Sequence, residues 1–118
     1  IDWLLRGVGK PDCYVEVKNV TMAEGRIAMF PDAVTARGAK HLKELMQMRQ
    51  QGARAAMVYC IQRGDVDAFQ PADHVDPLYG RLLREAADAG VELYALIADV
   101  SPAGIFLQRN VPVELDNH

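Results

Sequence analysis

The chain has 118 residues, half of them hydrophobic and a quarter charged, which fits one globular domain with a hydrophobic core. No stretch approaches the roughly 18 apolar residues that a membrane span requires, and no targeting signal is present, so we expect a cytoplasmic protein without a membrane partner. The net charge of −3 is unusual for a domain that holds nucleic acid by itself, because neutralising phosphates requires an excess of basic side chains.

The first residue and the cysteines add two further expectations. The sequence opens on Ile1 rather than on methionine, so we expect a fragment of a longer protein. If the domain contacts DNA, most of the binding should then come from the missing part. Cys13 and Cys60 both lie in apolar runs, which is typical of two buried thiols in a reducing compartment, and no Cys/His spacing indicates zinc.

The first thirty residues have the pattern of three strands. Residues 1–6 and 13–20 alternate in side-chain character with the period of a strand, and 7–12 between them is rich in turn-forming residues. A third short strand, 26–30, follows the turn at 24–25. Short turns between successive strands predict an antiparallel meander of all three.

The rest of the sequence alternates helices and strands. The predicted N-cap of the first helix is Asp32, and apolar positions then recur three and four residues apart until Gly52. The nearly continuous apolar run 53–61 is typical of a strand that is buried on both faces. The elements predicted after it are a polar loop at 62–77, a helix at 78–89, and strands at 91–100 and 105–107. This order predicts one α/β domain over residues 1–118, with a mixed sheet, flanking helices and a helical crossover to the fourth strand.

Glu16 and Lys18 are the strongest candidates for a chemical site. Residues two apart on a strand share a face, so these side chains point the same way, about 7 Å apart along the strand. If the first hairpin is centred near Gly9, Asp2 lies opposite Glu16 with Cβ atoms about 5 Å apart. Two carboxylates this close repel unless a cation lies between them, and such oxygen ligands suit Mg²⁺ or Mn²⁺. The lysine could then orient or help deprotonate an attacking water and stabilise charge that develops on phosphorus.

A plainer interpretation remains open for these charged residues. An acidic residue two positions before a lysine is common by chance, and antiparallel sheets often expose a solvated row of Asp, Glu and Lys. The first helix is the most basic element of the chain. Its residues Arg37, Lys40 and His41 are either a solvated helix face or phosphate contacts beside the active face.

Two long motifs closely resemble one protein family. They are Cys13-Tyr14-Val15-Glu16-Val17-Lys18-Asn19-Val20-Thr21 and Phe30-Pro31-Asp32-Ala33-Val34-Thr35-Ala36-Arg37-Gly38-Ala39-Lys40-His41-Leu42. Both resemble the sugar fermentation stimulation protein A family. The resemblance continues through 62–65, 69–73 and 107–113, and it therefore extends over nearly the whole chain.

That resemblance implies a fold and a set of site residues. Members of the family resemble an N-terminal OB-fold joined to a restriction-endonuclease-like PD-(D/E)xK domain, and they are described as bacterial-type DNA-binding proteins linked to sugar metabolism. By this likeness the chain is the nuclease-like domain, and the OB-fold is absent from it. Carried over by position, the catalytic residues are Asp2, Glu16 and Lys18. The expected ligands of Mg²⁺ or Mn²⁺ are Asp2, Glu16 and Val17, and the expected nucleic-acid contacts in the second motif are Arg37, Lys40 and His41.

The dipeptide Pro11-Asp12 is the literal match to the first letters of the PD-(D/E)xK motif, but geometry argues against it. Asp12 and Glu16 are four residues apart on one strand, a separation of about 13 Å, which is too long for two ligands of one ion. Asp2 is therefore the expected partner of Glu16, provided that the hairpin has the predicted register.

Three functions follow from these observations. The first is a metal-dependent phosphodiesterase that acts on DNA, with RNA as the alternative substrate. The second is a DNA-binding regulator of sugar metabolism genes that keeps the nuclease scaffold without turnover. The third, a sugar-metabolising enzyme, is suggested by the family's name alone, because no site with paired carboxylates of glycosidase type can be recognised in a sequence. In each case we expect an exposed hydrophobic surface where the absent domain docks.

Overall fold

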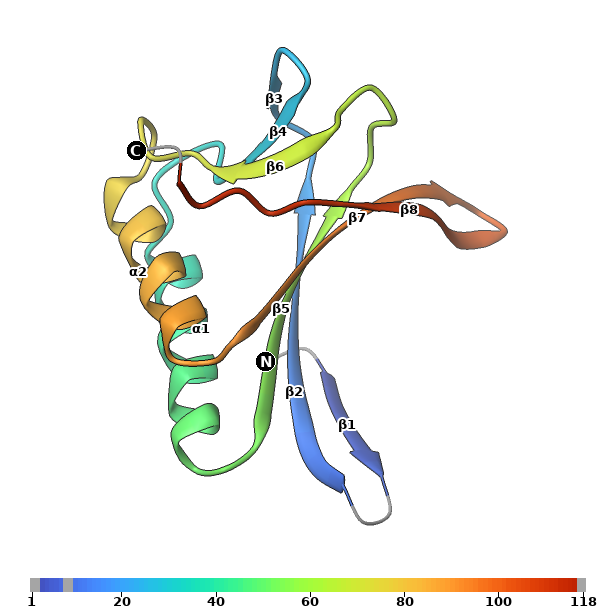
Figure 1. The fold of residues 1–118 in the computed structure, drawn as a ribbon. Coiled ribbons are helices and arrows are strands. Elements are labelled where there is room, and N and C mark those ends of the chain that lie inside the picture. Colours follow the sequence, from blue (N-terminus) through green and yellow to red (C-terminus); the bar gives the residue numbers. More distant parts are fainter. Residues whose placement is uncertain (1–2, 8–9, 117–118) are drawn as a thin grey trace.

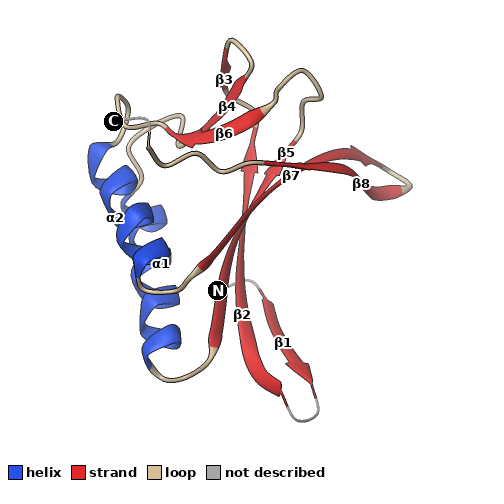
Figure 2. Cartoon of the chain, viewed as in Figure 1, coloured by secondary structure: helices blue, strands red, loops and turns tan. Residues whose placement is uncertain are grey.

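The computed structural model describes residues 3–7 and 10–116, which form a larger and a smaller sheet and two helices. The larger, five-stranded sheet has the order β1-β2-β5-β7-β8, and the smaller, three-stranded sheet has the order β3-β4-β6. Both helices lie on one side of the larger sheet (Figures 1 and 2). The predicted α/β class, with a mixed sheet and flanking helices, is confirmed. Within the described part of the chain, no helix is long and apolar enough to cross a membrane.

The first two strands form the predicted antiparallel hairpin. They are β1 (Trp3–Gly7) and β2 (Lys10–Val20). Trp3 pairs with Val15 and Leu5 with Cys13, which is the register that a hairpin centred near residue 9 predicts. The pairing shifts between Leu5 and Gly7, where the ladder is irregular. Asp2, the predicted partner of Glu16, lies outside the described residues.

The third predicted strand does not join this hairpin, so the expected three-stranded meander is wrong at that point. Instead, β4 (Ile27–Phe30) pairs antiparallel with the short β3 (Ala23–Glu24) and parallel with β6 (Ala68–Pro71). The strand β6 lies in the segment that the sequence predicted as a loop. Ala68 and Phe69 are buried within it, and this apolar pair draws β4 away from β2 into a second sheet.

Three strands at the centre of the larger sheet run parallel to one another. β2 pairs with β5 (Arg54–Ile61), and β5 pairs with β7 (Glu92–Ser101). Helix α1 (Ala36–Gln50) and helix α2 (Pro77–Asp88) lie in the two connections, as parallel pairing requires long crossovers. The edge strand β8 (Gly104–Val111) returns antiparallel to β7. The predicted apolar strand at 53–61 is confirmed as β5, whose residues are buried in both alternating sets apart from Arg54, which is exposed, and Val58, which is half-buried.

Helix α1 begins later than predicted. Its N-cap is Thr35 rather than Asp32, because the Thr35 hydroxyl accepts a hydrogen bond of 2.9 Å from the amide of Gly38. Asp76 caps α2 by accepting from the amide of Tyr79 at 3.0 Å. The other oxygen of Asp76 accepts from the amide of Thr35, also at 3.0 Å. One buried carboxylate therefore holds the first residues of both helices.

The hydrophobic core lies between the helices and the sheet. Leu42 and Leu45 of α1 have no exposed surface, and they pack with residues such as Met57 and Ile61 of β5. Leu83 of α2 joins the same cluster. Cys13 and Cys60 are buried free thiols, as the sequence predicted.

Candidate functional site

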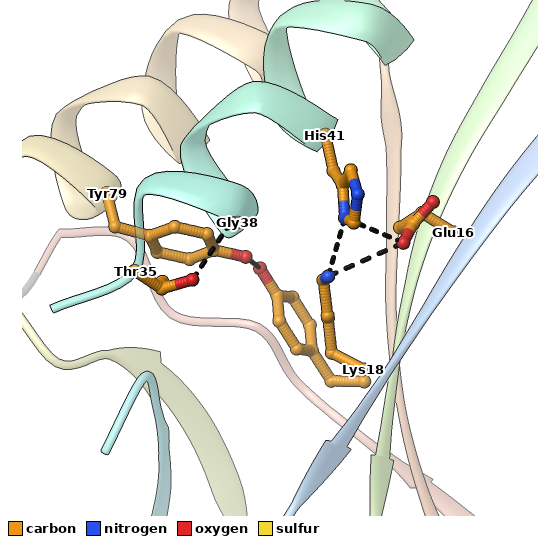
Figure 3. Close-up of polar contacts among 7 residues, drawn as sticks. Glu16, Lys18, Thr35, Gly38, His41 and Tyr79 are labelled. Atoms are coloured by element: carbon orange, nitrogen blue, oxygen red, sulfur yellow. Dashed lines mark hydrogen bonds and ion pairs between the residues drawn. The ribbon is translucent and has the colours of Figure 1, made fainter. Parts of the chain in front are cut away.

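Glu16, Lys18 and His41 meet where β2 faces α1 (Figure 3). The Nζ atom of Lys18 lies 3.4 Å from Oε1 of Glu16 and 2.7 Å from Nδ1 of His41. The same Nδ1 atom lies 2.9 Å from Oε1 of Glu16. The side chain of Glu16 is 2% exposed, that of His41 12% and that of Lys18 15%. These three residues are not the solvated row of charges that would be ordinary on an antiparallel sheet.

The side chain of His41 has two potential partners for one ring nitrogen. A neutral ring with its proton on Nε2 accepts a hydrogen bond from the Lys18 ammonium at Nδ1, whereas a ring with its proton on Nδ1 donates to Glu16. Burial lowers the pKa of His41 below its ordinary value, and the charge of Lys18 lowers it further, although Glu16 acts in the opposite direction. The lowered pKa favours the neutral ring, in which Nδ1 can hold the ammonium of Lys18.

Buried aromatic residues lie next to this cluster. The hydroxyl of Tyr59, which pairs with Lys18 in the sheet register, lies 2.6 Å from the hydroxyl of Tyr79 on α2. The ring of Tyr59 stacks on Phe69 with centroids 4.1 Å apart, and Phe30 packs against both tyrosines. Burial raises the pKa of Tyr59 and of Tyr79, so both phenols stay protonated at neutral pH. The apolar wall that they form helps to keep water away from the Lys18 side chain.

The start of α1 is fitted closely to α2 beside the site. A Cβ atom added to Gly38 would lie 2.7 Å from a side-chain carbon of Thr35 and 3.1 Å from the ring of Tyr79. Gly38, Thr35 and Tyr79 are grouped in Figure 3 on the side of Lys18 away from Glu16. Sequence reasoning missed Thr35 and Asp76, although Asp-Pro before an apolar helix is a recognisable start signal with proline at the first helical position.

The sequence-predicted residues are thus only partly brought together. Glu16 and Lys18 share a buried site, and His41, predicted as a phosphate contact, lies within it rather than on the outer face of its helix. Arg37 and Lys40 are exposed on α1.

Of the three predicted metal ligands, the structure describes Glu16 and Val17. Both can offer oxygen atoms to a hard cation. Glu16 supplies carboxylate oxygens, and Val17 has no oxygen except in its backbone, so its carbonyl is the atom that could ligate. Oxygen donors of both kinds suit Mg²⁺. In 3–7 and 10–116, no group of three or more His, Cys, Asp or Glu side chains is placed to hold an ion, and the third expected ligand, Asp2, lies outside those ranges.

The sequence and the fold match those of known proteins. A profile of the "Sugar fermentation stimulation protein RE domain" matches residues 1–104. The "Sugar fermentation stimulation protein homolog" of Thioalkalivibrio sulfidiphilus is 58% identical over 117 residues, and that of Geobacter sulfurreducens is 55% identical over 113 residues. These matches cover 98% and 96% of this chain but 48% of each relative, so the chain spans about half the length of the curated relatives it matches.

A solved structure is also similar over most of the chain. It is described as "The structure of Pyrococcus Furiosus SfsA in complex with Ca2+" and has 36% sequence identity with this chain. The superposition has a TM-score of 0.80 and covers 87% of this chain and 45% of the Pyrococcus protein. Family profile, relatives and structure agree, and the chain belongs to the sugar fermentation stimulation protein family.

Proposed function

We propose that this chain is the catalytic domain of a cytoplasmic, Mg²⁺-dependent phosphodiesterase that acts on DNA. The observation that carries the proposal is the pairing of Glu16 with Lys18 at 3.4 Å in a site where the carboxylate is 2% exposed. Burying two opposite charges is expensive, and a buried ion pair is weak evidence for a purely stabilising role. A carboxylate for a metal ion and an ammonium for a phosphate are, by contrast, what phosphodiester hydrolysis requires.

Each residue of the cluster has a proposed role. Glu16 and the carbonyl of Val17 would ligate the ion together with Asp2, and the ion would polarise the phosphate and activate a water molecule. Lys18 would orient that water or stabilise the charge developing on phosphorus, while Nδ1 of His41 keeps the ammonium in place. The Ca²⁺ named with the Pyrococcus relative supports a divalent cation, because Ca²⁺ and Mg²⁺ both select oxygen ligands.

DNA would approach along the exposed side of α1. Arg37 and Lys40 lie there, within one turn of His41, and their charges suit phosphate oxygens. The net charge of −3 means that these contacts position DNA more than they hold it. We expect the remaining half of the protein, by family likeness an OB-fold, to supply most of the affinity.

Cleavage assays on the full-length protein test the proposal. We expect cleavage of DNA in Mg²⁺ or Mn²⁺ and none in EDTA. Both Glu16→Gln and Lys18→Met should lower the rate by on the order of 10²-fold or more, because each removes charge that acts in the transition state. RNA of matched length, assayed in parallel, identifies the preferred nucleic acid.

Exposed residues of the same charge on α2 provide the controls. Glu85→Gln and Arg81→Met neutralise a carboxylate and a cation away from the cluster and should keep full activity. The proposal fails if no metal-dependent cleavage is found, or if the cluster variants and their controls cleave at the same rate.

A second candidate is a DNA-binding regulator of sugar metabolism genes that retains the scaffold without turnover. It is favoured by the contacts of Glu16, since Oε1 lies near both Lys18 and His41 and the described residues contain no three-ligand metal group. This function predicts salt-dependent DNA binding by the full-length protein that Glu16→Gln leaves unchanged, with no cleavage in any divalent ion.

A further inference from the structure

The face of the larger sheet opposite the helices is lined by apolar side chains. Side chains alternate along a strand, so Val15 and Val17 point away from the face that carries Glu16 and Lys18. In-register neighbours share a side, and Val17 pairs with Val58 of β5, which in turn pairs with Tyr94 of β7. We call this surface the open face. Its apolar members on β2, β5, β7 and β8 are Cys13, Val15, Val17, Ala56, Val58, Cys60, Tyr94, Leu96, Ala98 and Leu107, and the polar Asn110 lies beside Leu96.

The charges described on this surface are confined to one margin and paired with each other. Arg54 donates two hydrogen bonds to the carboxylate of Glu92, at 2.9 and 2.7 Å. The hydroxyl of Tyr94 donates to the same carboxylate at 2.7 Å. Between this margin and Asn19 at the other end, the accessible groups on β2, β5 and β7 are the ring of Tyr94 and four half-buried aliphatic side chains, those of Val15, Val17, Val58 and Leu96. The smaller side chains of Cys13, Ala56, Cys60 and Ala98 are buried between them. Such a surface has little to bind except another apolar surface.

No described element covers the open face. Both helices lie on the other side of the sheet (Figure 1). Yet β5 is a nearly continuous apolar run between two parallel neighbours, a pattern typical of strands that are covered on both faces. Tyr94 is 42% exposed, although its parallel neighbour Val58 is half-buried. The fold of these residues therefore has a layer on one face and lacks one on the other.

We propose that the open face packs against the part of the full-length protein that lies outside these 118 residues. The match to the Thioalkalivibrio relative covers 98% of this chain and 48% of that protein, so about as much polypeptide again is available to form the second layer. A segment tethered to the same chain has an effective concentration near the millimolar range, which favours it over a second molecule at ordinary protein concentrations. This inference is independent of whether the protein cleaves DNA.

Site-specific photo-crosslinking in the full-length protein tests the packing. Tyr94→p-benzoylphenylalanine replaces the phenol hydroxyl by a benzoyl group and so places a photoreactive ketone on the open face. Leu78→p-benzoylphenylalanine is the matched control, because Leu78 is 44% exposed, close to the 42% of Tyr94, and lies on α2. We expect position 94 to crosslink within one polypeptide to a peptide outside the 118 residues, and position 78 to give no such crosslink.

Two other crosslinking results overturn the proposal. If two isotopically distinct copies, mixed before irradiation, crosslink mainly to each other through position 94, the open face is an interface between copies. If position 94 gives the same products as position 78, or none, the face is not covered at all.

A second pair of variants tests the same packing without crosslinking. Val58→Lys should lower the melting temperature of the full-length protein by about 5 °C or more, because the ammonium would have to enter an apolar interface. Val34→Lys makes the same change at a residue that is 77% exposed and should leave the melting temperature unchanged. Equal melting temperatures for the two variants would contradict a buried open face.

Discussion

The two faces of the five-stranded sheet are built from the same strands but carry different side chains. On the helix-covered face, β2 presents Glu16 and Lys18, and β5 presents Met57 and Tyr59. On the open face, the intervening positions are aliphatic or thiol-bearing, with Val17 beside Val58. The charged groups of Glu16 and Lys18 thus lie on the side that α1 covers, where burial strengthens electrostatic interactions. The uncovered side carries mainly aliphatic and thiol groups. The comparison teaches that the candidate site lies on the covered face of this sheet, so exposure alone would not have identified it.

The largest effect should come from removing volume beneath the helices. Leu42 has no exposed surface, so Leu42→Ala should lower the free energy of unfolding by about 2–5 kcal/mol, as measured by denaturant titration. Leu78→Ala removes the same atoms from a side chain that is 44% exposed and should have a much smaller effect. Similar losses for the two variants would mean that the covered face is not the principal core.

A smaller effect is expected at the tyrosine pair. Tyr79→Phe removes one hydroxyl and leaves that of Tyr59, which is fully buried, without its partner at 2.6 Å. We expect the free energy of unfolding to fall by about 1–3 kcal/mol, because a buried polar group loses its hydrogen bond. Tyr94→Phe on the open face provides the control and should change stability by less. If the order of these two variants were reversed, the open face would be the more tightly constrained side.

Ionisation of the phenols of Tyr59 and Tyr79 should have the smallest effect on stability at neutral pH and a clear effect in alkali. Burial raises the pKa of Tyr59 and Tyr79, whereas in the unfolded chain a tyrosine ionises near pH 10. Above about pH 10 the unfolded chain releases protons that the folded chain retains, so stability should fall as pH rises. Unfolding curves measured from neutral pH into alkali should show this decline, and it should be weaker in Tyr79→Phe. Stability that rises over this range would contradict buried, protonated phenols.

The sequence predicts the parts of the fold with long, regular patterns. The hairpin register, the buried strand at 53–61 and both helices could be predicted because each depends on periodicity over many residues. The strand β6 could not, since four residues among polar neighbours give no periodic signal, and its pairing with β4 is a non-local choice. The sequence predicts the start of α1 at Asp32, because Asp is a good cap residue. The observed cap is Thr35, whose hydroxyl accepts from Gly38 and whose amide donates to Asp76 from another part of the chain.

The chemistry of the candidate site could be predicted from the sequence, but the full set of residues that form it could not. Two residues of one strand, Glu16 and Lys18, share a face by a rule of local geometry. The arrival of His41 depends on how α1 is rotated about its axis over the sheet, and a helical pattern alone does not fix that rotation. A histidine one residue before the buried Leu42 could equally have pointed to solvent. Whether His41 contacts phosphate or Lys18 is therefore decided by how α1 packs on the sheet.

The carboxylate of Asp76 gives the two helices a common anchor. Its two oxygens accept from the amides of Thr35 and Tyr79, so the start of α1 and the first turn of α2 are held by the same side chain. Replacing this single carboxylate would therefore remove a hydrogen-bond acceptor from the starts of both helices at once, including the helix that carries His41.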